Sequence, residues 1–186
     1  MHQPSRRIPY RTWPGALAIV LAMGGYVGGL TWWNRLTPAL RPLAAGQTIQ
    51  LCHARLLPAD GWATDVSLSR TGQSLMLVKG SGRFLVTIAA WSGGPDGPIA
   101  RQQRLMERVQ GLHLTGDSTD FVNPWGMQGV TFAYFGPTLT GRFWQVVDRQ
   151  RRLLVQIDFY SANGGFSDAL VEALSMVDSM DLEAPL

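Results

Sequence analysis

The sequence predicts an α+β protein with an N-terminal transmembrane helix, followed by an antiparallel β-sheet packed with helices. Three observations favour this fold class. Residues 15–33 form an apolar run without a charged side chain. Several short segments after residue 47 alternate apolar and polar residues, as half-buried strands do. Residues 98–110 and the segment after residue 165 carry apolar side chains at helical spacing instead.

The apolar run is expected to span a membrane. At about 1.5 Å per residue it is roughly 28 Å long, close to the thickness of a bilayer's hydrocarbon core. The tail before it, residues 1–14, carries three arginines and no acidic residue. The positive-inside rule therefore predicts a cytoplasmic N-terminus, a single pass and an extracytoplasmic domain in the cell membrane. A cleaved signal peptide is the alternative, but its cleavage site near residues 43–45 would lie far from the run.

Glycines repeat within this run in two overlapping small-xxx-small pairs. They are Gly24, Gly25, Gly28 and Gly29. Such pairs let the backbone of a second helix approach closely, which predicts a helix-packing face for a homo-oligomer or a membrane protein partner. Glycine is also frequent in membrane helices in general, and the two interpretations carry equal weight.

Charge and size limit what the remaining residues form. The three tail arginines account for the whole net charge of +3, so the rest of the 186-residue chain is neutral. A neutral domain argues against nucleic-acid binding, which needs a basic surface. The roughly 150 residues after the run suit one domain, and seven Trp, seven Phe and four Tyr give it a core.

The expected elements follow one another in a simple order. Residues 34–47, with two prolines, are expected to be a linker. Residues 48–182 form the predicted domain, and residues 183–186 a frayed end. The expected strands cover 48–56, 62–69, 73–79, 83–91, 127–135, 141–147 and 153–160. Their short connections predict antiparallel pairing. One helix is expected over 98–110 and another after residue 165, while 114–126 is expected to be turn-rich.

No catalytic or metal-binding motif is found. The sequence lacks a G-x-S-x-G elbow, an H-E-x-x-H motif and a cysteine pair, so we expect no cofactor and no metal. The single cysteine, Cys52, is next to His53 on an expected strand, where neighbouring side chains point to opposite faces and form no dyad. A small buried residue is the favoured interpretation of Cys52, with an intermolecular disulfide or reactive thiol as alternatives.

Four aromatic residues are candidates for a ligand or partner surface. They are Trp91, Trp125, Tyr134 and Trp144. Trp125 lies between a proline and a glycine, and together the four side chains could line a pocket between sheet and helix. An ordinary core position is the favoured interpretation of each.

The order of elements over residues 46–182 resembles the PsbP-like fold, an α/β/α sandwich. The resemblance rests on GQTIQLCHARLLPADGW at the entry strand, on LVEALSMVDSMDL at the close, and on the helix and three strands between them. More narrowly, the chain is similar to single-pass envelope proteins of actinobacteria. That resemblance implies a non-catalytic accessory protein whose outward domain binds lipid or a protein partner, such as a component of a secretion or envelope assembly. The alternatives are an exported hydrolase acting on the envelope and a small-molecule or lipid carrier.

Overall fold

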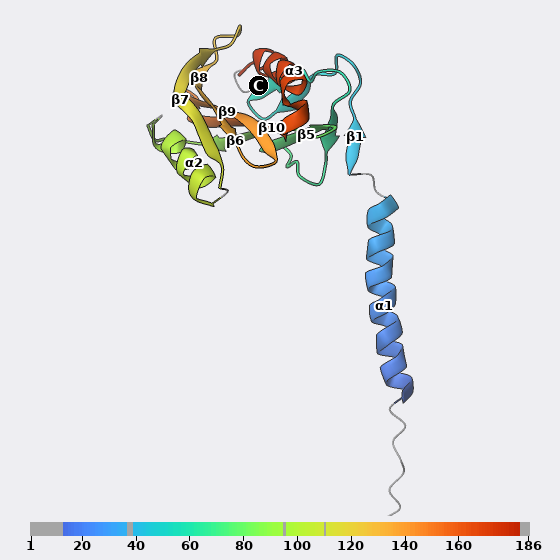
Figure 1. Ribbon diagram of the computed structural model, residues 1–186. Helices are drawn as coiled ribbons and strands as arrows, with labels where there is room; N and C mark the ends of the chain where they lie inside the picture. Colours follow the sequence, from blue (N-terminus) through green and yellow to red (C-terminus); the bar gives the residue numbers. More distant parts are fainter. Residues whose placement is uncertain (1–12, 37–38, 95, 110, 183–186) are drawn as a thin grey trace, which may run out of the picture. The chain divides into compact units, whose positions relative to one another are not determined.

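The computed structural model describes residues 13–36, 39–94, 96–109 and 111–182, and these fall into two units (Figure 1). One unit holds helix α1 (Trp13–Leu36), and the other begins at Ala39. The predicted basic tail, apart from residues 13 and 14, and the predicted frayed end lie outside the described residues.

Helix α1 covers the whole of the apolar run over residues 15–33. Over residues 15–30 its large apolar side chains are exposed in every direction around the helix; among them are Ile19, Val20, Leu21, Met23 and Val27. A Cβ atom placed on any of the four predicted packing glycines would meet nothing within 4 Å. In the part of the chain that the structure describes, no helix combines the length and the apolar character needed to cross a membrane, so the spanning role is not confirmed.

The second unit is built on an eight-stranded antiparallel sheet with the strand order β1-β4-β5-β6-β10-β9-β8-β7. Its strands are β1 (Leu40–Pro42), β4 (Ala63–Asp65), β5 (Ser74–Lys79), β6 (Gly82–Ala90), β7 (His113–Val122), β8 (Gln128–Phe135), β9 (Leu139–Asp148) and β10 (Leu153–Ala162). A separate hairpin contains β2 (Ile49–Leu51) and β3 (Ala54–Leu56). The antiparallel pairing predicted from the short connections is confirmed.

Helices cover the two faces of this sheet. The terminal helix α3 (Phe166–Asp178), preceded by the short 3-10 turn η1 (Asn163–Gly165), packs on β10 and β6 over the larger core. Helix α2 (Asp96–Val109) lies over a smaller core on the other face. The neighbouring residues Phe143 and Trp144 fall in different cores because successive side chains of a strand point to opposite faces.

Strand β7 contradicts the expectation that residues 114–126 are turn-rich. It pairs with β8 from His113 to Val122, with a bulge between Thr115 and Thr119. β7 is an edge strand that is exposed over most of its length, so neither of its faces needs apolar residues. The alternation that reveals a half-buried strand is therefore missing from its sequence.

Two shorter segments also differ from the expectation. The supposed linker over residues 34–47 includes β1, which pairs with β4 through Leu40, Arg41 and Pro42. Cys52 and His53 do not lie on a continuous strand but form the turn between β2 and β3, where Cys52 has φ of 30°. The expectation that both residues lie on one continuous strand is therefore wrong.

Candidate functional site

The turn that joins β9 and β10 is closed by an ion pair. Arg151 donates its backbone N–H to Asp148 Oδ1 at 2.9 Å and its guanidinium Nη1–H to Oδ2 at 2.6 Å. Partial burial opposes ionisation of Asp148, but these hydrogen bonds outweigh it and lower the pKa of the carboxyl below its usual value. The turn is thereby held in one conformation and presents Arg149 and Arg152 at its exposed side.

The turn between β7 and β8 is fastened to helix α3 by Asn123. Its buried amide donates from Nδ2 to the carbonyl oxygens of Val177, at 3.2 Å, and Met180, at 2.6 Å. Its Oδ1 accepts the backbone N–H groups of Trp125 and Met127 at 3.1 and 2.8 Å. These four hydrogen bonds hold the turn against the end of α3. The same turn carries Trp125, which is 59% exposed.

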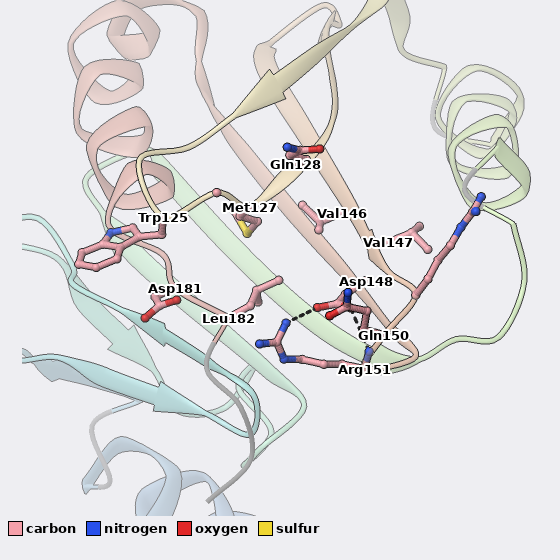
Figure 2. A pocket seen from close by; sticks show the side chains of 12 residues that line it. Trp125, Met127, Gln128, Val146, Val147, Asp148, Gln150, Arg151, Asp181 and Leu182 are labelled. Atoms are coloured by element: carbon pink, nitrogen blue, oxygen red, sulfur yellow. Dashed lines mark hydrogen bonds and ion pairs between the residues drawn. The ribbon is translucent and has the colours of Figure 1, made fainter.

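A pocket of about 570 Å³ lies between these two turns. Figure 2 shows Trp125 at one side, Leu182 in the centre and the paired Asp148 and Arg151 at the other. The two acidic residues of the lining are already neutralised, because Asp148 pairs with Arg151 and Asp181 pairs with Arg55. Arg149 also lines the pocket and has no ion-pair partner among the described residues.

A second pocket of about 610 Å³ lies on the other side of Arg149. It is lined by Trp91, the glycines that follow it, Arg149 and Arg152. The Trp91 indole donates to the carbonyl oxygen of Gly94 at 3.2 Å, which holds the ring against its own loop. We call Trp91, Trp125, Arg149 and Arg152 together the hairpin surface. It combines two aromatic side chains with two guanidinium groups that form no ion pair with any residue that the structure describes.

The four aromatic residues predicted from the sequence divide into two pairs. Trp91 and Trp125 come from distant parts of the chain and lie beside the two pockets that share Arg149. Tyr134 and Trp144 are each 2% exposed and belong to the cores under α2 and α3. Tyr134 and Trp144 thus have the core positions that were the favoured interpretation, and no pocket in the described part of the chain is lined by all four residues. The arginines were not chosen from the sequence, although the run DRQRR at residues 148–152 signals them.

A carboxyl–phenol pair lies beneath α2, with Tyr134 buried and Asp158 half-buried. Tyr134 donates its hydroxyl to Asp158 Oδ1 at 2.5 Å. Burial raises the pKa of Asp158 to about 6, although the hydrogen bond from Tyr134 opposes the shift. Burial, and the charge of Asp158, raise the pKa of Tyr134 as well. Gly141 lies under the Tyr134 ring, where a Cβ atom would overlap the ring atoms.

The remaining candidates for chemistry are dispersed. Among the described residues, no three His, Cys, Asp or Glu side chains are grouped so that they could hold a metal ion. His113 is exposed and packs on Phe135, with 5.4 Å between the ring centroids. Cys52 is exposed and, with His53, lines a third pocket of about 770 Å³.

Comparison with known proteins identifies the fold. Neither the models of protein families nor the curated proteins contain a match. The solution structure of cyanobacterial PsbP from Synechocystis sp. is similar over 75% of this chain and 94% of its own, with a TM-score of 0.56 and 13% identity. The Ran-binding protein Mog1p of Saccharomyces cerevisiae matches over 73% of this chain and 94% of its own, with a TM-score of 0.49 and 10% identity. The domain therefore has a PsbP-like fold.

Proposed function

We propose that the chain is a membrane-anchored, non-catalytic accessory protein of the cell envelope whose extracytoplasmic domain binds a protein partner. The observation that carries the proposal is the hairpin surface. Trp and Arg are the residue types that most often dominate the binding energy of protein interfaces. Here two of each are gathered around neighbouring pockets, with Trp125 59% exposed.

The charge of the hairpin surface indicates the kind of partner. The carboxylates of the first pocket are paired within the domain, whereas Arg149 and Arg152 have no ion-pair partner among the described residues. A guanidinium binds a carboxylate with two parallel hydrogen bonds, which fixes the orientation of the partner. The partner segment is therefore proposed to be acidic, with an apolar side chain that packs on Trp125.

Anchoring to the membrane is a separate part of the proposal. It is supported by the uncharged run over residues 15–33 and by the apolar side chains exposed on all sides of α1. A helix that is apolar all round needs an apolar environment on every side. The N-terminus inside, the domain outside and the actinobacterial envelope rest on the sequence alone. The glycine face remains a proposed contact with a second α1 helix or another membrane protein.

The binding proposal is tested with two matched triple variants of the full chain. Trp125→Ala, Arg149→Ala and Arg152→Ala together alter the hairpin surface. Leu105→Ala, Arg101→Ala and Arg108→Ala together remove one apolar and two basic side chains from the exposed side of α2. Both variants and the unaltered chain are purified from solubilised membranes, and the proteins that follow them are quantified by mass spectrometry.

We expect the recovery of one partner protein to fall at least tenfold with the first variant and to stay unchanged with the second. Crosslinks from the unaltered chain should map to an acidic segment of that partner. Equal recovery with both variants would refute the hairpin surface as the binding site.

Alkaline carbonate extraction tests the anchor: the full chain should stay with the membranes. Its release would refute anchoring by α1. Gly24→Leu with Gly28→Leu should reduce crosslinking in the membrane if the glycine face packs against a partner.

A further inference from the structure

The third pocket, of about 770 Å³, lies beside the turn between β2 and β3 and shares no lining residue with the hairpin surface. We call it the β2–β3 pocket. Most of its wall is apolar, and the apolar residues that line it are Leu68, Leu85, Ile88, Ala89, Ala90 and Leu153. Leu68, Ala89 and Ala90 are exposed, whereas Ile88 and Leu153 also belong to the core under α3. Its volume lies in the range of small-molecule sites, and a mainly apolar wall with a few polar groups is typical of them.

One polar atom of this pocket lacks a partner. Nδ1 of His53 is buried and makes no hydrogen bond. Buried polar atoms are nearly always satisfied, so a ring nitrogen that has no partner among the described residues needs an explanation, and a group supplied from outside the chain is one. The turn that holds it is unusual in backbone conformation, because Cys52 takes a left-handed φ of 30° that residues with a side chain seldom adopt.

The charge of the pocket has one sign. Arg70 is an exposed part of the lining, and no ion pair or hydrogen bond of its side chain occurs among the described residues. Among the described residues that line the pocket there is no Asp or Glu. Next to Arg70, the Leu68 side chain is 57% exposed, so apolar surface and a free guanidinium lie side by side. A ligand with an apolar body and an acidic head matches both.

We propose that the β2–β3 pocket binds a small amphiphilic carboxylate. Its apolar body lies on the exposed apolar residues of the lining, Leu68, Ala89 and Ala90. Its carboxylate accepts hydrogen bonds from the Arg70 guanidinium and from His53 in the tautomer that carries the proton on Nδ1. This binding does not depend on the hairpin surface, so either site can exist without the other.

The single cysteine of the chain gives a local readout, because Cys52 is exposed and lines the same pocket. The full chain is placed in lipid nanodiscs with a cysteine-free scaffold, and its rate of reaction with N-ethylmaleimide is measured. The probes are 4-phenylbutyrate, 4-phenylbutanol and 4-phenylbutylamine, which share an apolar body and differ in the charge of the head. We expect saturable protection by the acid, weaker protection by the alcohol and none by the amine.

Two pairs of variants locate the head group. Arg70→Ala should weaken protection by the acid roughly tenfold, the loss of one charge-assisted contact. Arg101→Ala, on α2, should leave it unchanged. His53→Ala should weaken it several-fold, whereas His113→Ala should not. Circular dichroism and the midpoint of thermal unfolding check that each variant is folded. Absence of protection, equal protection by the three probes, or equal behaviour of Arg70→Ala and Arg101→Ala would overturn the proposal.

Discussion

Tyr134→Phe removes a single hydroxyl from the core beneath α2 and keeps the ring. The hydroxyl donates to Asp158 at 2.5 Å, and the Tyr134 side chain is 2% exposed, so water cannot replace the lost donor readily. A hydrogen bond to a charged group contributes about 1.5–3 kcal/mol, and a neutral one about 0.5–1.5 kcal/mol. We therefore expect the variant to lose about 1.5–3 kcal/mol of unfolding free energy at pH 8, where Asp158 is ionised, and less at pH 4.

The pH dependence of the unaltered protein follows from the same residue. The pKa of Asp158 is raised from its ordinary 3.8 to about 6 in the folded chain. Its contribution to stability is fully present below about pH 4 and is lost as the pH rises through about 6, because the unfolded carboxyl ionises first. At 1.36 kcal/mol per pH unit the loss is at most about 3 kcal/mol. Without the Tyr134 hydroxyl the pKa rises further, which extends the loss to higher pH.

Urea unfolding of the full chain in a non-ionic detergent, followed by tryptophan fluorescence at pH 4 and pH 8, measures both effects. Tyr160→Phe is the matched control, since Tyr160 lies on the same strand face but makes no hydrogen bond to Asp158. Asp158→Asn should flatten the profile between pH 4 and pH 6. Equal losses for Tyr134→Phe and Tyr160→Phe at both pH values would refute the assignment of this hydrogen bond as a stabilising contact.

Three further substitutions test the packing. Glu172→Ala removes the acceptor of the buried Trp62 indole N–H, 2.7 Å away, and should lower the unfolding free energy by about 1.5–3 kcal/mol in the same urea assay. Gly141→Ala should lower it by about 1–3 kcal/mol and change the near-ultraviolet circular dichroism, because the new methyl group displaces the Tyr134 ring. Asn123→Ala leaves two backbone N–H groups and two carbonyl oxygens without their partner and should also lower it by about 1–3 kcal/mol.

Elements that bury one side were predictable from the sequence. β6 and β10 alternate along most of their length because one face of each packs under α3, and the apolar spacing of α3 reflects the same core. β7 and β1 were not predicted from the sequence, because both are exposed strands at the edges of the sheet. Their positions are set by hydrogen bonds to β8 and β4, which act on the backbone and leave no pattern in the side chains.

The turn at Cys52 and His53 was not predictable by the same reasoning. Alternation in TIQLCHARL continues across it, so the segment resembles one strand. The reversal needs a left-handed backbone at Cys52, a conformation for which glycine or asparagine is the usual signal. Trp91 and Trp125 were recognisable as candidates by residue type alone. The run DRQRR signals Arg149 as well, but its place between the two pockets was not predictable, because that place results from the pairing of β9 with β10.

Asn123 links the stability of the domain to the proposed binding surface. Its side chain joins the last turn of α3 to the backbone of Trp125, so the position of this indole depends on four hydrogen bonds that lie behind it. If Trp125 is a binding anchor, Asn123→Ala must reduce partner recovery even under conditions in which the variant is fully folded. Gln128→Ala, which alters an exposed residue of the same pocket that no such bonds involve, is the control. Unchanged recovery with folded Asn123→Ala would show that binding does not need the indole in this place, and the contribution of Trp125 would then have to be reassigned to the arginines.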